Sequence, residues 1–238
     1  YLGKTMPRID MAEKVTGAAK YGSDIALQGL RFATVKMNPK HSGMKSFDAR
    51  VAKEMPGVEK VIDLGDGFAV VATNTWLAMQ AAEAVNVIWE AAPYPQTSDT
   101  MQKAFVAALS KQPEAIELKS GDFDEPHKGT KIDAEYSVPW LAHASMEPMT
   151  ATALFENGEL SVWAGNQAPL SAQKACAEAV GIEPEKVTLN TPYIGGSFGR
   201  RGNTDFTVQV AKIAAALPGT PIRLVWSREE DMRRDYYR

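Results

Sequence analysis

The sequence predicts an α+β fold, because segments with the periodicity of strands are interspersed with segments that have the periodicity of helices. Residues 30–37 alternate apolar and polar side chains, as a half-buried strand does. The Asn157–Gly158 pair is a hairpin-turn signal between two further strand segments. After Asn203, apolar residues recur as far as Leu217 at the spacing of an amphipathic helix. With 238 residues, 45% of them hydrophobic, the chain can bury one sizeable core or two modest ones.

Residues 1–91 are predicted to form a small α+β domain. Its first 28 residues are polar and contain glycine and proline at turn positions, so we expect an irregular entry arm. Pro56 and Gly57 end a short helix that Asp48 can cap. The expected strands are 30–37, 58–64, 68–72 and 86–90, and the expected helices are 49–55 and 75–85.

Residues 92–130 are predicted to be a linker with one helix, and residues 131–238 to begin a second α+β domain. The linker helix is expected from Asp99 or Thr100 to Ser110, followed by a polar surface connection. In the second domain, the expected strands are 132–138, 150–156, 159–163, 187–190 and 222–226, and the expected helices are 171–180, 204–217 and one that begins at Ser227.

The stretch from Thr191 to Asn203 contains four glycines and connects a predicted strand to a predicted helix. Glycine adopts positive φ without steric cost, so such a turn can aim several backbone N–H groups at one anion or oxo group, beside the N-terminus of the helix. Arg200 and Arg201 add fixed charge next to it. A tight connection with no ligand explains the glycines equally well.

Two other short stretches contain side chains that could carry chemistry. His143 and Glu147 could form a metal or acid/base pair, but a metal needs a third ligand, and neither His41 nor His127 lies in a supporting pattern. A buried, hydrogen-bonded structural corner is the favoured interpretation. Gln167 follows the strand 159–163 at the end where ligand sites collect, and its amide could reach an oxo group; a turn or helix-capping role is the alternative.

Composition excludes several other classes of function. The net charge of −3 supplies no basic surface for nucleic acid, and the single cysteine, Cys176, allows no disulfide and no cysteine-based zinc or iron–sulfur site within the chain. No apolar run is long enough to span a membrane, and no signal-peptide profile is present. A P-loop, a Ser–His–Asp arrangement and an HExxH motif are also missing. The start at Tyr1 and the charged end at Arg238 predict that the chain is part of a longer protein.

Ten short motifs, spread from near the start of the chain to its end, resemble those of one enzyme family. They are Pro7–Asp10, Lys14–Gly17, Tyr21–Asp24, Met55–Val58, Ala69–Ala72, Thr75–Trp76, Ala142–Pro148, Trp163–Gln167, Gly195–Arg201 and Trp226–Met232. As a set they resemble the molybdenum hydroxylases of the xanthine dehydrogenase and aldehyde oxidase family. Within that family the similarity is to the large (beta) subunit of the isoquinoline 1-oxidoreductase or aldehyde dehydrogenase type.

This resemblance implies an α/β hammerhead domain over residues 1–91 and the first part of a molybdopterin-binding domain over residues 131–238. It implies a molybdopterin cofactor, in the cytosine dinucleotide form of bacterial relatives, and oxidative hydroxylation of a small-molecule substrate with oxygen from water. Electrons would pass to a small partner subunit with [2Fe–2S] clusters, and the remainder of the large subunit would be the other partner. The cofactor-binding residues implied are Gln167, Gly196, Phe198, Gly199 and Arg200, with no direct metal ligand.

Two departures from the family pattern limit what the chain does alone. The glutamate that serves as general base lies in a C-terminal segment outside these residues, so no catalytic residue is assigned here. Arg201 and Gly202 stand where purine-oxidising members have an acidic contact, which favours an aldehyde or N-heteroaromatic substrate. Family resemblance implies a periplasmic or membrane-associated location, with the cytoplasm as the alternative. From other classes, a phosphate- or nucleotide-binding module and a structural interaction module remain open.

The chain by itself is expected to contain no stoichiometric molybdenum and to oxidise no aldehyde, because the site needs the general base and the remaining cofactor contacts. Metal analysis and an aldehyde dehydrogenase assay on residues 1–238 check this. Turnover by these residues alone would contradict it.

Overall fold

The computed structural model describes residues 1–95, 97–114, 118, 120–121, 128–130 and 132–237, and these residues divide into two compact units. One unit contains residues 1–91 together with 142–238, and the other contains residues 92–141. His127 lies outside the described residues. No helix among the described residues has the length and apolar character needed to cross a membrane.

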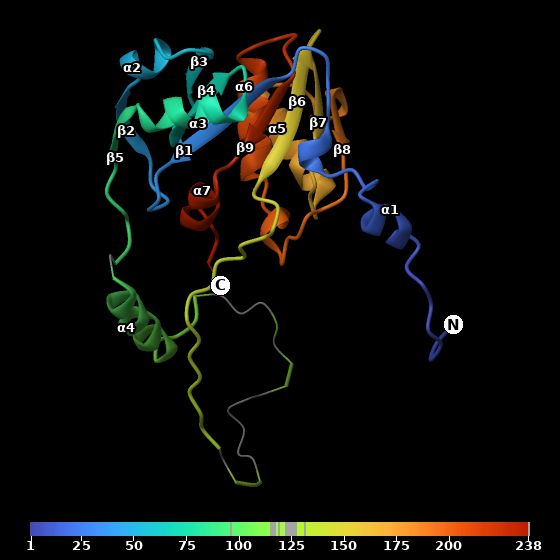
Figure 1. Ribbon diagram of the computed structural model, residues 1–238. Coiled ribbons are helices and arrows are strands. Elements are labelled where there is room, and N and C mark those ends of the chain that lie inside the picture. Colours follow the sequence, from blue (N-terminus) through green and yellow to red (C-terminus); the bar gives the residue numbers. More distant parts are fainter. Residues whose placement is uncertain (96, 115–117, 119, 122–127, 131, 238) are drawn as a thin grey trace. The chain divides into compact units, whose positions relative to one another are not determined.

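A seven-stranded mixed sheet forms the centre of the first unit, with the strand order β3-β4-β1-β9-β6-β7-β8 (Figure 1). Its strands are β1 (Arg31–Met37), β3 (Val58–Asp63), β4 (Gly67–Ala72), β6 (Thr150–Glu156), β7 (Glu159–Trp163), β8 (Val187–Asn190) and β9 (Ile222–Val225). A separate ribbon pairs β2 (Met44–Asp48) with β5 (Asn86–Trp89). The predicted α+β fold class is confirmed.

The helices of this unit are α1 (Met11–Thr16), α2 (Arg50–Lys53), α3 (Thr75–Glu83), α5 (Pro169–Val180), α6 (Asp205–Ala215) and α7 (Arg228–Arg233). Several of them pack on the sheet or on each other, whereas α1 has no buried residue. Helix α3 packs on β1 and β4, whereas α6 packs on β6 and β9 and also contacts α5. Asn74 caps α3 as expected, accepting a hydrogen bond from the backbone N–H of Leu77.

Strand β4 shows why the sheet carries helices on both faces. All six of its residues are buried, and successive side chains of a strand point to opposite faces. Phe68 and Val70 enter one core with residues of α3, whereas Ala69 and Val71 enter the larger core with residues of α6. The uninterrupted apolar run of β4 is therefore the sequence signature of a strand covered on both sides.

Strand β9 joins the two parts of the sequence that were predicted as successive domains. It pairs in parallel with β1, where Phe32 lies opposite Arg223, and antiparallel with β6, where Thr152 also lies opposite Arg223. Each part alone would leave a sheet edge with unpaired backbone groups, and β9 fills the position between those edges. Residues 1–91 and 142–238 consequently share one sheet and one continuous core.

Several details differ from the sequence-based expectations. The strand expected at 132–138 is wrong: the described residues there form no strand, and Ile132, Tyr136 and Val138 are exposed. Among the described residues of their unit there is one helix, α4 (Ser98–Leu109), and no strand that could supply backbone hydrogen-bond partners. The sequence analysis also missed β2 and the short helix α1, each of which has little apolar periodicity.

Replacing Leu224 in β9 with alanine is expected to lower the free energy of unfolding by about 2–5 kcal/mol, because a fully buried leucine leaves a cavity between both halves of the sheet. Urea titration followed by circular dichroism measures the change. Leu170→Ala is the matched control, since that side chain is 80% exposed on α5. Equal effects of the two substitutions would contradict the position of β9.

Candidate functional site

The glycine-rich turn connects β8 to α6 and holds an unusual backbone conformation. Gly196, Phe198 and Gly199 have φ angles of 99°, 56° and 107°, all in the left-handed region. For a non-glycine residue this region costs about 1–3 kcal/mol, and such strain gathers at binding and active sites. Phe198 nevertheless adopts it with 64% of its surface exposed. The surrounding structure must therefore stabilise the turn.

The buried guanidinium group of Arg201 stabilises the glycine turn through several hydrogen bonds. Its Nε donates to the carbonyl oxygen of Gly196 at 2.9 Å, and one terminal nitrogen donates to the carbonyl oxygen of Glu147 at 2.8 Å and to its carboxylate at 3.1 Å. The other terminal nitrogen lies 3.4 Å from the carbonyl oxygen of Gly165. Burial lowers the pKa of Arg201, and the charge of Glu147 opposes that shift.

Glu147 holds the turn from the opposite side. Its carboxylate accepts a hydrogen bond from the N–H of Gly195 at 3.1 Å, and its own N–H donates to the carbonyl oxygen of Gly195 at 3.0 Å. A Cβ atom on residue 195 would lie 2.5 Å from the Cβ of Glu147, so only glycine allows this approach. The segment before β6 is thus clamped to the turn.

Ser197 connects the turn to Gln167. Its hydroxyl accepts a hydrogen bond from the N–H of Arg201 at 3.0 Å and donates to Oε1 of Gln167. The backbone N–H of Gln167 donates to the carbonyl oxygen of Arg201 at 3.0 Å. Because Oε1 is engaged, the amide nitrogen of this exposed side chain is the group left to donate to a ligand.

Arg200 lies inside the protein rather than on the surface. Its guanidinium is fully buried, donates to both carboxylate oxygens of Asp205 at 3.0 and 2.8 Å, and lies 3.3 Å from Asp235. It also stacks near the rings of Trp226 and Tyr236. Burial opposes the charged form, but Asp205 and Asp235 raise the pKa of Arg200 overall. Both arginine charges lie beside the turn, as expected, yet both are neutralised by carboxylates that are partly or fully buried.

His143 and Glu147 do not pair with each other. His143 donates its backbone N–H to Asp235, and its Nδ1 lies 2.8 Å from that carboxylate. Each residue is therefore part of a hydrogen-bonded corner, but with partners that sequence reasoning missed. Among the described residues no group of three or more histidine, cysteine, aspartate or glutamate side chains is arranged to hold a metal ion.

Some backbone N–H groups of the turn lack a hydrogen-bond partner in the described part of the chain. Those of Gly196 and Gly199 make no hydrogen bond within the described part of the chain. Gly199 is exposed, as are Phe198 and Gln167, whereas Gly196 is half-buried. Unpaired donors on a turn at positive φ form the kind of concavity that binds anionic or oxo groups. Of the five predicted site residues, Gly196 and Gly199 thus contribute unpaired N–H groups, Phe198 and Gln167 contribute exposed side chains, and Arg200 supports the turn from inside.

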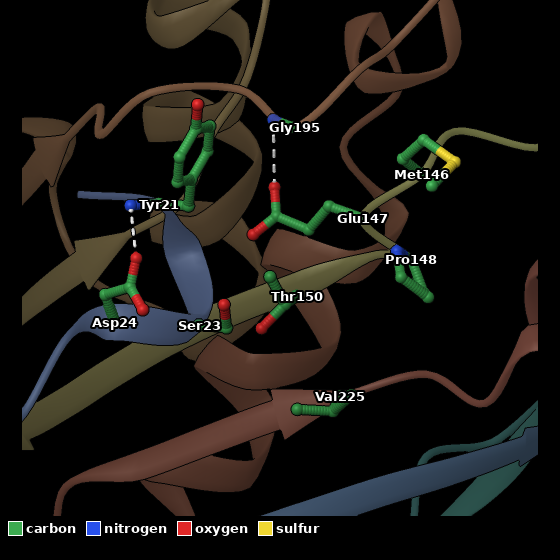
Figure 2. Close-up of a pocket in the computed structure, with 9 residues that line it drawn as sticks. All are labelled: Tyr21, Ser23, Asp24, Met146, Glu147, Pro148, Thr150, Gly195 and Val225. Atoms are coloured by element: carbon green, nitrogen blue, oxygen red, sulfur yellow. Dashed lines mark hydrogen bonds between the residues drawn. The ribbon is translucent and has the colours of Figure 1, made fainter. Parts of the chain in front are cut away.

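A pocket of about 500 Å³ lies on the other side of the Glu147 carboxylate. Figure 2 shows Tyr21, Ser23 and Asp24 on one side of the pocket and the hydrogen bond from Gly195 to the Glu147 carboxylate on the other. The second carboxylate oxygen, Oε1, is buried without a hydrogen-bond partner in the described part of the chain. None of the five predicted site residues lines this pocket, so it is distinct from the exposed surface of the turn.

Comparison with known proteins identifies the family of the chain. Residues 108–238, more than half of the chain, match the model of the molybdopterin cofactor-binding domain. The chain belongs to the molybdopterin cofactor-binding domain family. The open donors of the turn and the Gln167 amide therefore belong to a domain whose ligand carries phosphate and oxo groups, and their chemistry fits that ligand.

Similar proteins extend the match to the rest of the chain. The whole chain is 32% identical to the isoquinoline 1-oxidoreductase subunit beta of Brevundimonas diminuta, covering 32% of that protein. Over 97% of its length it is 29% identical to a membrane-bound aldehyde dehydrogenase of Gluconacetobacter polyoxogenes, covering 31% of it. The chain thus spans about a third of the length of these relatives.

Two solved structures share the fold. The aldehyde oxidoreductase of Desulfovibrio gigas matches 99% of the chain with a TM-score of 0.75 at 23% identity, and 31% of that structure is covered. The quinoline 2-oxidoreductase of Pseudomonas putida 86 matches 96% of the chain with a TM-score of 0.73 at 21% identity, covering 35% of that structure. The shared sheet of residues 1–91 and 142–238 is therefore a feature of a known architecture.

Replacing Arg201 with methionine is expected to destabilise the protein by about 2–4 kcal/mol, because the Glu147 carboxylate, with 13% of its side chain exposed, would lose its counter-charge. Urea titration of the variant measures the loss. Arg8→Met serves as the control, since its side chain is 67% exposed and pairs only with Asp10. A loss no larger than that of the control would show that the clamp does not stabilise the turn.

Proposed function

We propose that the chain is the cofactor-binding portion of the large subunit of a molybdenum oxidoreductase. One observation carries the proposal: the N–H groups of Gly196 and Gly199 are unpaired, and the side chain of Gln167 beside them is exposed. These donors can bind oxygen atoms of the cofactor without displacing any internal hydrogen bond. The molybdenum cofactor, when bound, supplies a two-electron redox centre for hydroxylation with oxygen from water.

The residues of the chain have distinct tasks in this proposal. Gly196 and Gly199 bind through their backbone, Gln167 donates through its amide, and Phe198 covers the site with its exposed ring. Arg200 and Arg201 act indirectly, because their buried ion pairs fix the backbone that carries the donors. Preorganised donors need not reorient when the ligand arrives, which strengthens their effect on developing negative charge.

Further parts of the proposal follow from the similar proteins. The relatives named for isoquinoline and for aldehydes support an N-heteroaromatic compound or an aldehyde as substrate. The first relative is named as a subunit beta, which supports at least one further subunit, and the second is named as membrane-bound, which supports a membrane-associated location. We propose that the further subunit contains iron–sulfur clusters and accepts the electrons, and that the location is periplasmic or membrane-associated. We also propose the cytosine dinucleotide form of the cofactor, and an α/β hammerhead domain for residues 1–91.

The full-length protein, produced in a host that makes molybdopterin cofactors, is expected to contain one molybdenum and one releasable cytidine monophosphate per chain. It should oxidise an aldehyde or an N-heteroaromatic compound with an artificial electron acceptor, and label from ¹⁸O-water should appear in the product. Metal analysis, nucleotide chromatography and mass spectrometry measure these three quantities. A folded full-length protein without molybdenum would overturn the proposal.

Gly199→Ala in that protein is expected to reduce molybdenum content at least severalfold, because alanine disfavours the φ of 107° that directs the N–H outward. Gly202→Ala is the matched control: residue 202 has no positive φ, and a Cβ there meets no atom within 4 Å. Molybdenum per chain and the melting temperature are measured together. Equal molybdenum content in the two variants would contradict a role for the residue 199 backbone.

A further inference from the structure

The imidazole ring of His143 is held rigidly beside the glycine turn. Its side chain is 8% exposed, and Asp235 fixes it through two contacts, one to the backbone N–H and one to Nδ1. Asp235 is itself 2% exposed and also accepts the N–H of Tyr236 at 2.8 Å. A histidine whose Nδ1 is bound to a carboxylate has a defined ring orientation, and only Nε2 remains for another partner.

Nε2 of His143 has no hydrogen-bond partner in the described part of the chain, although the rest of the ring is enclosed. It points at Gly199: a Cβ on that residue would lie 3.6 Å from Nε2 and 3.9 Å from Cδ2. Gly199, whose own N–H is unpaired, therefore lies next to an unpaired ring nitrogen. Two polar groups that belong to different segments, and that lack partners at the same place, indicate a common ligand.

The hydrogen-bonding roles of Nε2 fit a ligand that presents an oxygen atom. Arg200, Asp205 and Asp235 form one buried cluster with one positive and two negative charges. With its Nδ1 proton held by Asp235, His143 accepts a hydrogen bond through Nε2 when neutral and donates one when protonated. It can therefore bond to a hydroxyl or to an oxo or phosphate oxygen, whereas a metal-ligating role would need further ligands that are not grouped here.

We propose that His143 is a ligand-contacting residue of this site, and that its Nε2 forms a hydrogen bond to an oxygen atom of the group bound over Gly199. Asp235 is a positioning residue that acts only through the ring. The identity of that group as the molybdenum cofactor, or a substrate beside it, rests on the proposed function. The contact itself rests on the geometry of His143 and Gly199.

Two substitutions of His143 distinguish a ligand contact through Nε2 from a structural role through Asp235. In His143→Asn the amide nitrogen can replace Nδ1 and keep the bond to Asp235, but nothing replaces Nε2. In His143→Gln the amide nitrogen lies farther along the side chain and can replace Nε2, whereas the bond to Asp235 is lost. If His143 contacts the ligand, asparagine therefore removes the contact and glutamine retains it. If His143 only supports the structure through Asp235, glutamine is instead the more damaging substitution.

The test uses the full-length, cofactor-loaded protein and measures molybdenum release during dialysis and the Mo(V) electron paramagnetic resonance spectrum. His143→Asn is expected to release molybdenum about tenfold faster and to alter the spectrum, because a hydrogen bond to a charged group contributes on the order of one factor of ten. His143→Gln is expected to stay within about threefold of the unsubstituted protein.

Each other outcome has a definite meaning. If His143→Asn matches the unsubstituted protein in both measurements, or if His143→Gln is the more damaging change, the contact is refuted while the proposed function stands. Should the unsubstituted full-length protein contain no molybdenum, the proposed function fails first. The contact is then tested with inorganic phosphate, whose binding would have to weaken in His143→Asn and persist in His143→Gln; equal binding would refute it.

Discussion

The guanidinium group of Arg201 is the interaction on which the candidate site depends. It is 1% exposed and hydrogen-bonds to carbonyl oxygens from three segments that are far apart in sequence, at Glu147, Gly165 and Gly196. A guanidinium presents five donors on three nitrogen atoms of a rigid plane, whereas a lysine presents three donors on one nitrogen atom, so arginine reaches carbonyl groups that lie farther apart. One buried side chain thereby fixes the loop before β6, the loop after β7 and the glycine turn.

The neighbouring Arg200 attaches the glycine turn to two further segments. Its charge is balanced by Asp205 at the start of α6 and by Asp235 after α7, so the turn is tied to both helical segments. Burying charges costs several kcal/mol per ion unless they are paired and hydrogen-bonded, and the two carboxylates meet that requirement for Arg200. The result is a backbone whose open N–H groups are held in place before any ligand binds.

The site could be held in this way only because the sheet is continuous. Strand β9 lies between β1 and β6 and leads directly into Trp226 and α7, which bring Asp235 under the turn. The Trp226 indole is anchored by a hydrogen bond to Gln209 of α6 at 2.9 Å. Residues from both ends of the chain thus determine where His143 and Arg200 lie, although neither end contributes an open donor to the site.

Local sequence patterns were sufficient to predict most of the strands and helices, the hairpin at Asn157, and the position of the glycine turn between β8 and α6, because these depend on local periodicity and on backbone conformations that glycine favours. The resemblance to a known family also predicted that Gln167 and Phe198 lie at one site.

Three features became apparent only in the folded chain: the burial of both arginines, the hydrogen bond from Ser197 to Gln167, and the pairing of His143 with Asp235. These contacts join residues up to 92 positions apart, and local sequence patterns contain no information on which charged groups will be buried together. The parallel pairing of β1 with β9 is of the same kind, because a sheet edge finds its partner through the packing of the whole core.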